Sequence, residues 1–194
     1  MSQKALSPTL WRTCRALANR TRLEIIRELI NNPGLTVSCI ARRNRITVSS
    51  ASINLRALNA RGIIRSKRKG KHVFYTVASD PSVAWTELLV KAIQRTFANC
   101  RNPCDLLYRQ ATAFTHPRRI TICRALLSKG PLAFEQLVSE CRISRQALTR
   151  HLDKLRRRGI VSRKERSWAI SAQKDLFSKA LLKIVAEQEQ SPVR

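Results

Sequence analysis

The spacing of apolar residues predicts that most of the chain folds into short amphipathic helices. From residue 9 to residue 60, apolar side chains recur every three or four positions, which is the period of a helix with one buried face. The same period returns in the second half of the chain. The predicted helices cover residues 9–18, 22–30, 36–43, 47–60, 80–98, 106–114 and 172–187, and a further helix starts at His116-Pro117.

Two pairs of predicted helices have the pattern of a helix-turn-helix, in which the second helix of each pair is the recognition helix. One pair is 36–43 with 47–60, which ends at Gly62; the other lies between Leu132 and Val161. In the second pair, Ser144 is a favourable N-cap for the second helix, and Gly159 can adopt the left-handed conformation that ends it. The predicted buried stripe of that helix consists of Leu148, Leu152 and Leu155.

The hydrophobic period changes after each helix-turn-helix. After Gly62 the helical period gives way to a period of two, and the segments 64–68 and 71–77 flank Lys69-Gly70, which predicts a β-hairpin. Its predicted core-facing residues are Val73, Tyr75 and Val77. A shorter hairpin is predicted with residues 163–166 at its tip. A helix-turn-helix followed by a hairpin is a winged helix.

The two halves of the chain also align with each other. An offset of 97 residues places Ala16–Ile64 on Ala113–Val161 without a gap, and 13 of the 49 aligned positions are identical. Such internal similarity indicates a repeated structural unit. We therefore predict a mainly α fold with small β-hairpin wings: two tandem winged helix-turn-helix domains, each followed by a long helix. The segment Cys100–Cys104 is the predicted boundary, which gives domains 1–99 and 100–194.

The charge of the chain narrows the choice of partner. It has 38 Lys and Arg against 12 Asp and Glu, a net charge of +26 over 194 residues. Because like charge at this density opposes folding, we expect an anionic partner, with nucleic acid ahead of an acidic membrane surface or an acidic protein. No apolar run approaches the ~20 residues that cross a bilayer, and the first residues lack a signal-peptide pattern. We expect a cytoplasmic, nucleoid-associated protein with no membrane partner, whose six cysteines are free thiols.

The polar face of the second recognition helix carries donors that suit base edges. Arg145, Gln146 and Arg150 can bind guanine or adenine in the major groove, with contact to phosphate as the alternative. In the first copy this face is small or apolar, and the basic hairpin suits phosphate or the minor groove. We hypothesise that helix 144–157 specifies the sequence and that hairpin 65–72 supplies affinity. The predicted wing contacts are Arg65, Lys67, Arg68, Lys69, Lys71 and His72 in the first hairpin, and Arg163, Lys164 and Arg166 in the second.

Three stretches of the chain resemble the ArsR-type winged-helix transcriptional regulators: ALANRTRLEIIRELI, SINLRALNARGIIRSKRKGKHVFYTV and TRHLDKLRRRGIV. Members of that family are typically homodimers that bind palindromic operators and pair through their first and last helices. Many release DNA on binding a metal or on thiol oxidation. The family's thiolate pair would fall at Thr36 and Ser38, with Cys39 alone beside them, so sensing of a soft metal is not supported. The DNA contacts that the resemblance implies are Ser49, Ser50, Ile53, Asn54, Arg145, Gln146, Thr149, Arg150 and His151.

Other chemistry finds little support in the sequence. Cys100 and Cys104 could join Cys14 or Cys123 in a zinc or redox site, but the spacing is not that of a CxxC knuckle and no cluster of His or carboxylates accompanies it. Buried cysteine also serves as a small hydrophobe. The three histidines have no paired acid, and the glycines form no phosphate loop. We predict no enzyme activity, no cofactor and no metal.

The sequence therefore predicts a sequence-specific transcriptional regulator that binds double-stranded DNA. The alternatives are a low-specificity architectural DNA-binding protein and a tandem winged-helix scaffold that docks on an acidic protein or on RNA. Because both recognition helices lie in one chain, the apolar faces of the first and last helices of each half could pair within it as a pseudo-dimer. The competing hypothesis is that these faces hold a homodimer.

Overall fold

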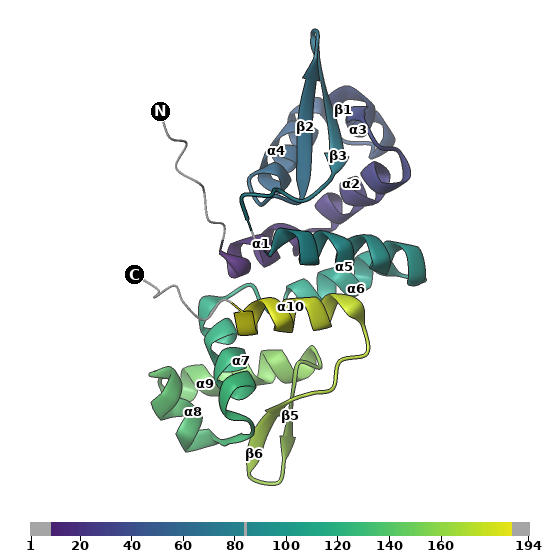
Figure 1. Ribbon diagram of the computed structural model, residues 1–194. Helices are drawn as coiled ribbons and strands as arrows, with labels where there is room; N and C mark the ends of the chain where they lie inside the picture. The colour runs from purple at the N-terminus through teal and green to yellow at the C-terminus, as the bar shows by residue number, and fades with distance from the viewer. Residues whose placement is uncertain (1–8, 84, 188–194) are drawn as a thin grey trace.

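The computed structural model describes residues 9–83 and 85–187, so the start of the first predicted domain and the end of the second lie outside the described residues. The predicted fold class is confirmed: the structure is mainly helical and contains two winged helix-turn-helix units (Figure 1). The first unit comprises α1 Leu10–Leu17, α2 Arg20–Asn31, β1 Leu35–Thr36, α3 Val37–Arg43, α4 Val48–Asn59, β2 Ile64–Lys69, β3 His72–Val77 and α5 Thr86–Asn99. The second unit comprises α6 Pro103–Ala111, α7 Pro117–Lys129, β4 Leu132–Ala133, α8 Phe134–Cys141, α9 Arg145–Arg157, β5 Val161–Lys164, β6 Ser167–Ile170 and α10 Leu176–Glu187.

Both predicted hairpins form, and each gains a third strand that the sequence did not predict. The strand orders are β1-β3-β2 and β4-β6-β5, antiparallel throughout. β1 and β4 contain two residues each, too few to show an alternating pattern. They tie the start of each helix-turn-helix to its wing, for example through the pairing of Leu35 with Tyr75. Tyr75 and Val77 pack against the core as predicted, whereas Val73 lies further out along the hairpin and is half-buried.

The two helix-turn-helices use the same local geometry at positions that the offset of 97 residues aligns. The hydroxyls of Thr47 and Ser144 accept the backbone N–H of the third residue of α4 and of α9, at 3.1 and 3.3 Å, which satisfies one free donor at each helix start. The preceding turns contain Arg45 and Arg142 with φ of 53° and 49°. Each recognition helix is followed by a glycine at positive φ, Gly62 and Gly159, as predicted.

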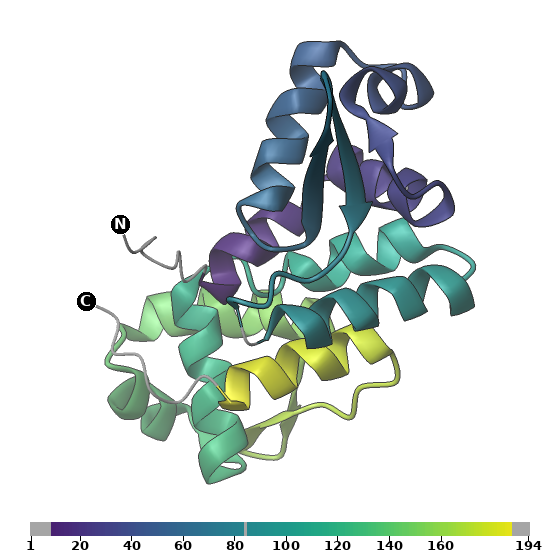
Figure 2. The same cartoon turned by 45° about the horizontal axis from the view of Figure 1, so that its top comes forward.

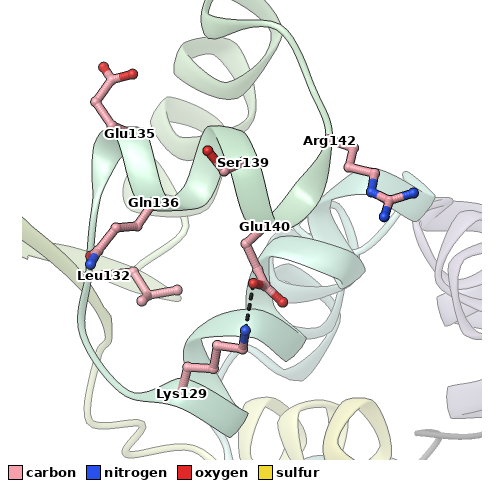
Figure 3. Close-up of a pocket in the computed structure, with 7 residues that line it drawn as sticks. All are labelled: Lys129, Leu132, Glu135, Gln136, Ser139, Glu140 and Arg142. Atoms are coloured by element: carbon pink, nitrogen blue, oxygen red, sulfur yellow. Dashed lines mark hydrogen bonds and ion pairs between the residues drawn. The ribbon is translucent and has the colours of Figure 1, made fainter.

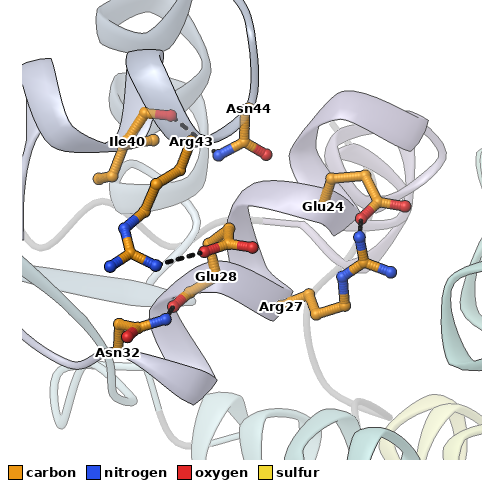
Figure 4. Close-up of polar contacts among 7 residues, drawn as sticks. All are labelled: Glu24, Arg27, Glu28, Asn32, Ile40, Arg43 and Asn44. Atoms are coloured by element: carbon orange, nitrogen blue, oxygen red, sulfur yellow. Dashed lines mark hydrogen bonds and ion pairs between the residues drawn. The ribbon is translucent and has the colours of Figure 1, made fainter.

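An ion pair joins the first helix of each helix-turn-helix to the helix before it. In the first unit Glu28 of α2 pairs with Arg43 of α3 at 3.4 Å, next to the pair of Glu24 with Arg27 (Figure 4). In the second unit Lys129 of α7 pairs with Glu140 of α8 at 2.6 Å (Figure 3). Since Arg43 and Glu140 occupy aligned positions, the second unit reverses the polarity of this junction.

Three helices begin three or more residues away from the predicted start. The helix expected from Asp80 begins at Thr86, because the Asp80 carboxylate instead accepts the backbone N–H and hydroxyl of Ser82 at 2.9 and 2.8 Å and closes a turn. The Thr86 hydroxyl donates to the carbonyl oxygens of Val83 and Asp80 and joins this turn to α5. The last helix starts at Leu176 rather than residue 172, and α6 starts three residues early at Pro103.

The long helices pack between the two winged parts. α5 contacts α10 and α6, and α6 also contacts α1 and α2, so the two units share one continuous core (Figure 2). At its edge Arg20 of α2 pairs with Asp105 of α6 at 2.6 Å and lies over the ring of Tyr108. None of the helices in residues 9–83 and 85–187 is long and apolar enough to cross a membrane. The fully buried residues from these central helices include Leu89, Ile93, Leu107, Phe177, Leu181, Ile184 and Val185.

Candidate nucleic-acid interface

The recognition helix of the second unit, α9, buries one face and exposes a basic one. Its predicted apolar stripe is confirmed, since Leu148, Leu152 and Leu155 are buried. The opposite face begins directly after the Ser144 cap, and the four predicted base-reading residues of its first turns are exposed. These are Arg145, Gln146, Thr149 and Arg150. The helix therefore presents donors to solvent where a major groove would accept them.

Arg145 has a partner that the sequence pattern did not indicate. Its guanidinium forms an ion pair with Glu135 of α8 at 2.7 Å, and the two side chains are 71% and 58% exposed. An ion pair this open to water contributes ~1 kcal/mol or less. A DNA phosphate or a guanine edge can therefore replace Glu135 at small cost. Glu135 lies on the outer face of α8, directed away from the junction with α7 (Figure 3).

His151 faces α7 instead of standing free on the outer face of α9. Its ring contacts that of His116 in a tilted arrangement, with centroids 4.7 Å apart and planes at 42°. Partial burial, followed by the charges of His116 and three neighbouring arginines, lowers the pKa of His151 to about 4. Burial and the charges of Arg119 and Arg118 also lower the pKa of His116. Both imidazoles are therefore neutral at pH 7.

A cavity of about 550 Å³, which we call the basic pocket, lies between the start of α7 and the side of α9. Only Arg150 and His151 of its lining were predicted to contact DNA. The sequence did contain a signal for the other basic residues of the pocket. Residues 150, 154 and 157 are spaced to lie on one helix face, and two arginines directly follow His116-Pro117. The pocket is lined by His116, Arg118, Arg119, Ala147, Arg150, His151, Asp153, Lys154 and Arg157.

The recognition helix of the first unit, α4, presents a different surface. Val48 and Ile53 are 52% and 57% exposed, at the positions that align with Arg145 and Arg150. Ser49 is exposed and Ser50 half-buried. Asn54 is half-buried, and its amide donates to the Ser50 carbonyl oxygen at 2.9 Å. The helix therefore offers methyl groups and hydroxyls, with no charged donor among the predicted reading positions.

The wing of the first unit is longer and more basic than that of the second. Its two strands contain six residues each, against four each in the second wing. The wings extend to opposite ends of the molecule (Figure 1). Each predicted wing contact is solvent-exposed. They are Arg65, Lys67, Arg68, Lys69, Lys71 and His72 in the first wing, and Arg163, Lys164 and Arg166 in the second.

The cysteines are dispersed, and most are buried. Burial raises the pKa of Cys123 to about 12 and those of Cys104 and Cys141 to about 11, which keeps these thiols protonated. At the position of the family's metal box, Thr36 instead caps α3, and its hydroxyl accepts the Cys39 N–H at 3.4 Å. In the described part of the chain, no group of three or more His, Cys, Asp or Glu could hold a metal ion.

Comparison of the sequence with those of known proteins assigns the chain to a family. A helix-turn-helix domain profile matches residues 114–163, which span most of α7 to β5. The chain is 33% identical over 76 residues to the HTH-type transcriptional regulator Rv0324 of Mycobacterium tuberculosis, covering 39% of this chain and 33% of that protein. It is also 33% identical over 75 residues to the transcriptional activator HlyU of Vibrio cholerae, covering 39% of this chain and 68% of that protein. The chain belongs to the ArsR-type family of winged helix-turn-helix regulators.

Proposed function

We propose that this protein is a transcriptional regulator that binds double-stranded DNA in a sequence-specific manner. The observation that carries the proposal is the outer face of α9, where Arg145, Gln146 and Arg150 are exposed beside the basic pocket. A capped helix with exposed bidentate donors next to uncompensated positive charge has the features that direct readout requires: base contacts for specificity and phosphate contacts for position.

The two units divide this work between them in our proposal. α9 reads base edges in this proposal, because Arg145 and Arg150 can each donate to two acceptors of one guanine, and Gln146 can donate to adenine N7 and accept from its amino group. The first unit supplies affinity through the wing of β2 and β3, whose basic residues face solvent on both sides beyond Ile64. Such a ribbon suits phosphate oxygens or the minor groove. α4 then adds apolar contact through Val48 and Ile53, which suits thymine methyl groups.

We further propose that one chain does the work of a family homodimer, with domains 1–99 and 100–194 as its two halves. α5 and α10 pack on each other inside the chain, so faces that pair two chains elsewhere are occupied here. Because the exposed faces of α4 and α9 differ, the preferred DNA site is not a palindrome. Light scattering on the purified protein tests this arrangement: a mass of 22.1 kDa supports it, and a mass of twice that value supports a homodimer.

A salt titration distinguishes the proposed regulator from the alternatives. A duplex enriched from a random pool and a scrambled duplex of equal length would be titrated with protein at several salt concentrations. The proposal predicts a specificity ratio of ~10³ or more, with a steep salt dependence for both duplexes. A ratio near one would indicate an architectural DNA-binding protein, for which the net charge of +26 is suitable. Failure to bind any duplex at low salt would favour the scaffold.

A further inference from the structure

The basic pocket carries a feature that only the second unit has. His116 stands immediately before α7 and His151 lies on α9, and their rings are in contact. The aligned positions of the first unit are Asn19 and Asn54. Asn19 is the N-cap of α2, as His116 is of α7, so the local fold needs only a hydrogen-bond acceptor at this position. The imidazole pair is therefore not required by the helix-turn-helix itself.

The charges around the histidine pair are not balanced within the described residues. Five cationic side chains line the pocket and only one carboxylate, Asp153, which forms an ion pair with Arg156 at 3.6 Å. No ion pair joins any of the five cations to an acidic side chain of residues 9–83 or 85–187. The five are Arg118, Arg119, Arg150, Lys154 and Arg157. Positive charge gathered in a concave site attracts an anion.

Arg119 is held in a way that fits an anion site. Its guanidinium donates to the carbonyl oxygens of Ala113 and Thr112 at 2.6 and 3.3 Å and to the Thr115 hydroxyl at 2.7 Å. These neutral oxygens fix the side chain without neutralising it. Burial lowers the pKa of Arg119, and burial together with neighbouring arginines lowers that of Lys154. The shifts have the direction expected for cations that lack a counter-charge.

Of the two histidines, His151 is the one free to accept a proton. The Nδ1 atom of His116 accepts the backbone N–H of Arg118 at 3.1 Å, so protonation at that nitrogen would break the cap of α7. No hydrogen bond of this kind engages His151 within the described residues. The titratable and charged groups that face it are His116, Arg118 and Arg119 from the start of α7, and Arg150, Asp153, Lys154 and Arg157 from α9.

We propose that the basic pocket holds a phosphate of the DNA backbone and that His151 takes up a proton from solvent when this phosphate binds. The inference rests on the proposed function and adds a regulatory property to it. DNA affinity of the second unit then depends on pH through this histidine pair, whereas the first unit has asparagines at both aligned positions.

The sign of the effect follows from linkage. In the free protein His151 remains neutral down to a pH of about 4. A bound phosphate favours the imidazolium and raises this pKa, so the complex carries more protons than the free protein at any pH between the two values. DNA affinity therefore increases as the pH falls through this interval, by up to about tenfold per pH unit for one proton.

The test is a set of binding isotherms at constant ionic strength between pH 7.5 and 5.5. Fluorescence anisotropy with the preferred duplex would be measured for the wild type, for His151→Asn and for His72→Asn. We expect the wild-type dissociation constant to fall about fivefold or more over this range, and His151→Asn to lose most of this fall. Because His72 is itself a predicted wing contact, the same comparison is repeated in the His72→Asn background, where His151→Asn should again remove the slope and leave a change of less than about twofold. Because the chain has three histidines, His116→Asn completes the set and retains an N-cap.

Each result has a defined meaning. A flat profile for the wild type, or an unchanged slope in His151→Asn, would overturn the inference while leaving the proposed DNA-binding function in place. Loss of all duplex binding at every pH would instead overturn the proposed function. NMR titration of the His151 ring in the wild type separates the sources of phosphate. A raised pKa with duplex supports the backbone contact, and an equal rise with inorganic phosphate alone would replace it with a free-anion site.

Discussion

The two recognition helices share a frame but not a surface. α4 and α9 both start after a hydroxyl cap, follow a turn residue in the left-handed region and end before a glycine at positive φ. Their outward positions differ in chemistry, with Val48 and Ile53 where α9 has Arg145 and Arg150. The comparison teaches that caps and buried leucines determine the fold, whereas the exposed face can change without disturbing it.

The wings differ in the opposite sense. The first unit, whose helix lacks charged readers, has the longer wing with the larger group of basic residues. The second unit, whose helix is basic, has the shorter wing. Positive charge is thus carried mainly by the hairpin in one unit and mainly by the helix in the other, which is the basis of the proposed division of labour.

The largest expected difference between the units is in folding stability, when the glycine that follows each recognition helix is replaced by alanine. A Cβ on Gly62 would lie 2.9 Å from the Asp80 Cβ and 3.2 Å from the Thr86 Cγ2, whereas a Cβ on Gly159 meets nothing within 4 Å. Both glycines have positive φ, so each alanine incurs backbone strain of ~1–2 kcal/mol, and overpacking adds ~1–3 kcal/mol only at Gly62. Urea denaturation should show a clearly greater loss for Gly62→Ala. Equal losses of stability would mean that the turn at Asp80 moves away from the added Cβ at no energetic cost.

The next effect concerns base reading. Arg145→Ala should weaken binding to the preferred duplex by about 10- to 100-fold and leave binding to a scrambled duplex almost unchanged, because a bidentate base contact contributes ~1–3 kcal/mol of discrimination. The matched control is Val48→Ala at the aligned position of α4, for which we expect less than about a threefold change. Anisotropy titrations on both duplexes make the comparison. Uniform loss on both duplexes would show that Arg145 contacts phosphate instead.

Much of the fold could be predicted from local patterns. The stripe of Leu148, Leu152 and Leu155, the Ser144 cap and the glycine after each recognition helix depend on residues within one turn of each other, so short-range spacing was sufficient. The predicted start of α5 was wrong because the Asp80-Pro81 pair is compatible both with a helix start and with a tight turn. The hydrogen bonds of Asp80 to Ser82 decide between them, and spacing alone does not show those bonds.

The site was less predictable because its key contacts join separate elements. The exposed face of α9 followed from helical spacing, but the contact of His116 with His151 depends on how α7 crosses α9. The Glu135–Arg145 pair likewise depends on the angle between α8 and α9. The predicted DNA-binding role of His151 stays a prediction, and its position beside α7 favours a role in the basic pocket.

A smaller and more uniform effect should follow from removing charge on the wings. The double variant Lys67→Ala/Lys69→Ala should weaken binding to all duplexes by about tenfold at moderate salt and reduce the slope of log K against log salt by about two, one for each lost phosphate contact. The counterpart Lys164→Ala/Arg166→Ala on the short wing should have a weaker effect. A change of sequence preference in the first variant would contradict the division of labour.

The smallest expected effect is on the stability of the free protein and has the opposite sign to the effect on DNA affinity. The pKa of His151 is about 4 in the folded chain, below the ordinary value of 6.5, so the unfolded chain binds more protons between these two values. Stability is therefore complete above pH 6.5 and decreases as the pH falls towards 4. Because His151 is only partly buried, solvent screening limits the loss, and we expect the melting temperature to drop by about 2–3 °C between pH 7 and pH 5. In His151→Asn, with asparagine as at position 54 of the first unit, this drop should shrink. If calorimetry shows the same drop in melting temperature in both proteins, the pH dependence of stability in this range comes from carboxylates and not from the imidazole of His151.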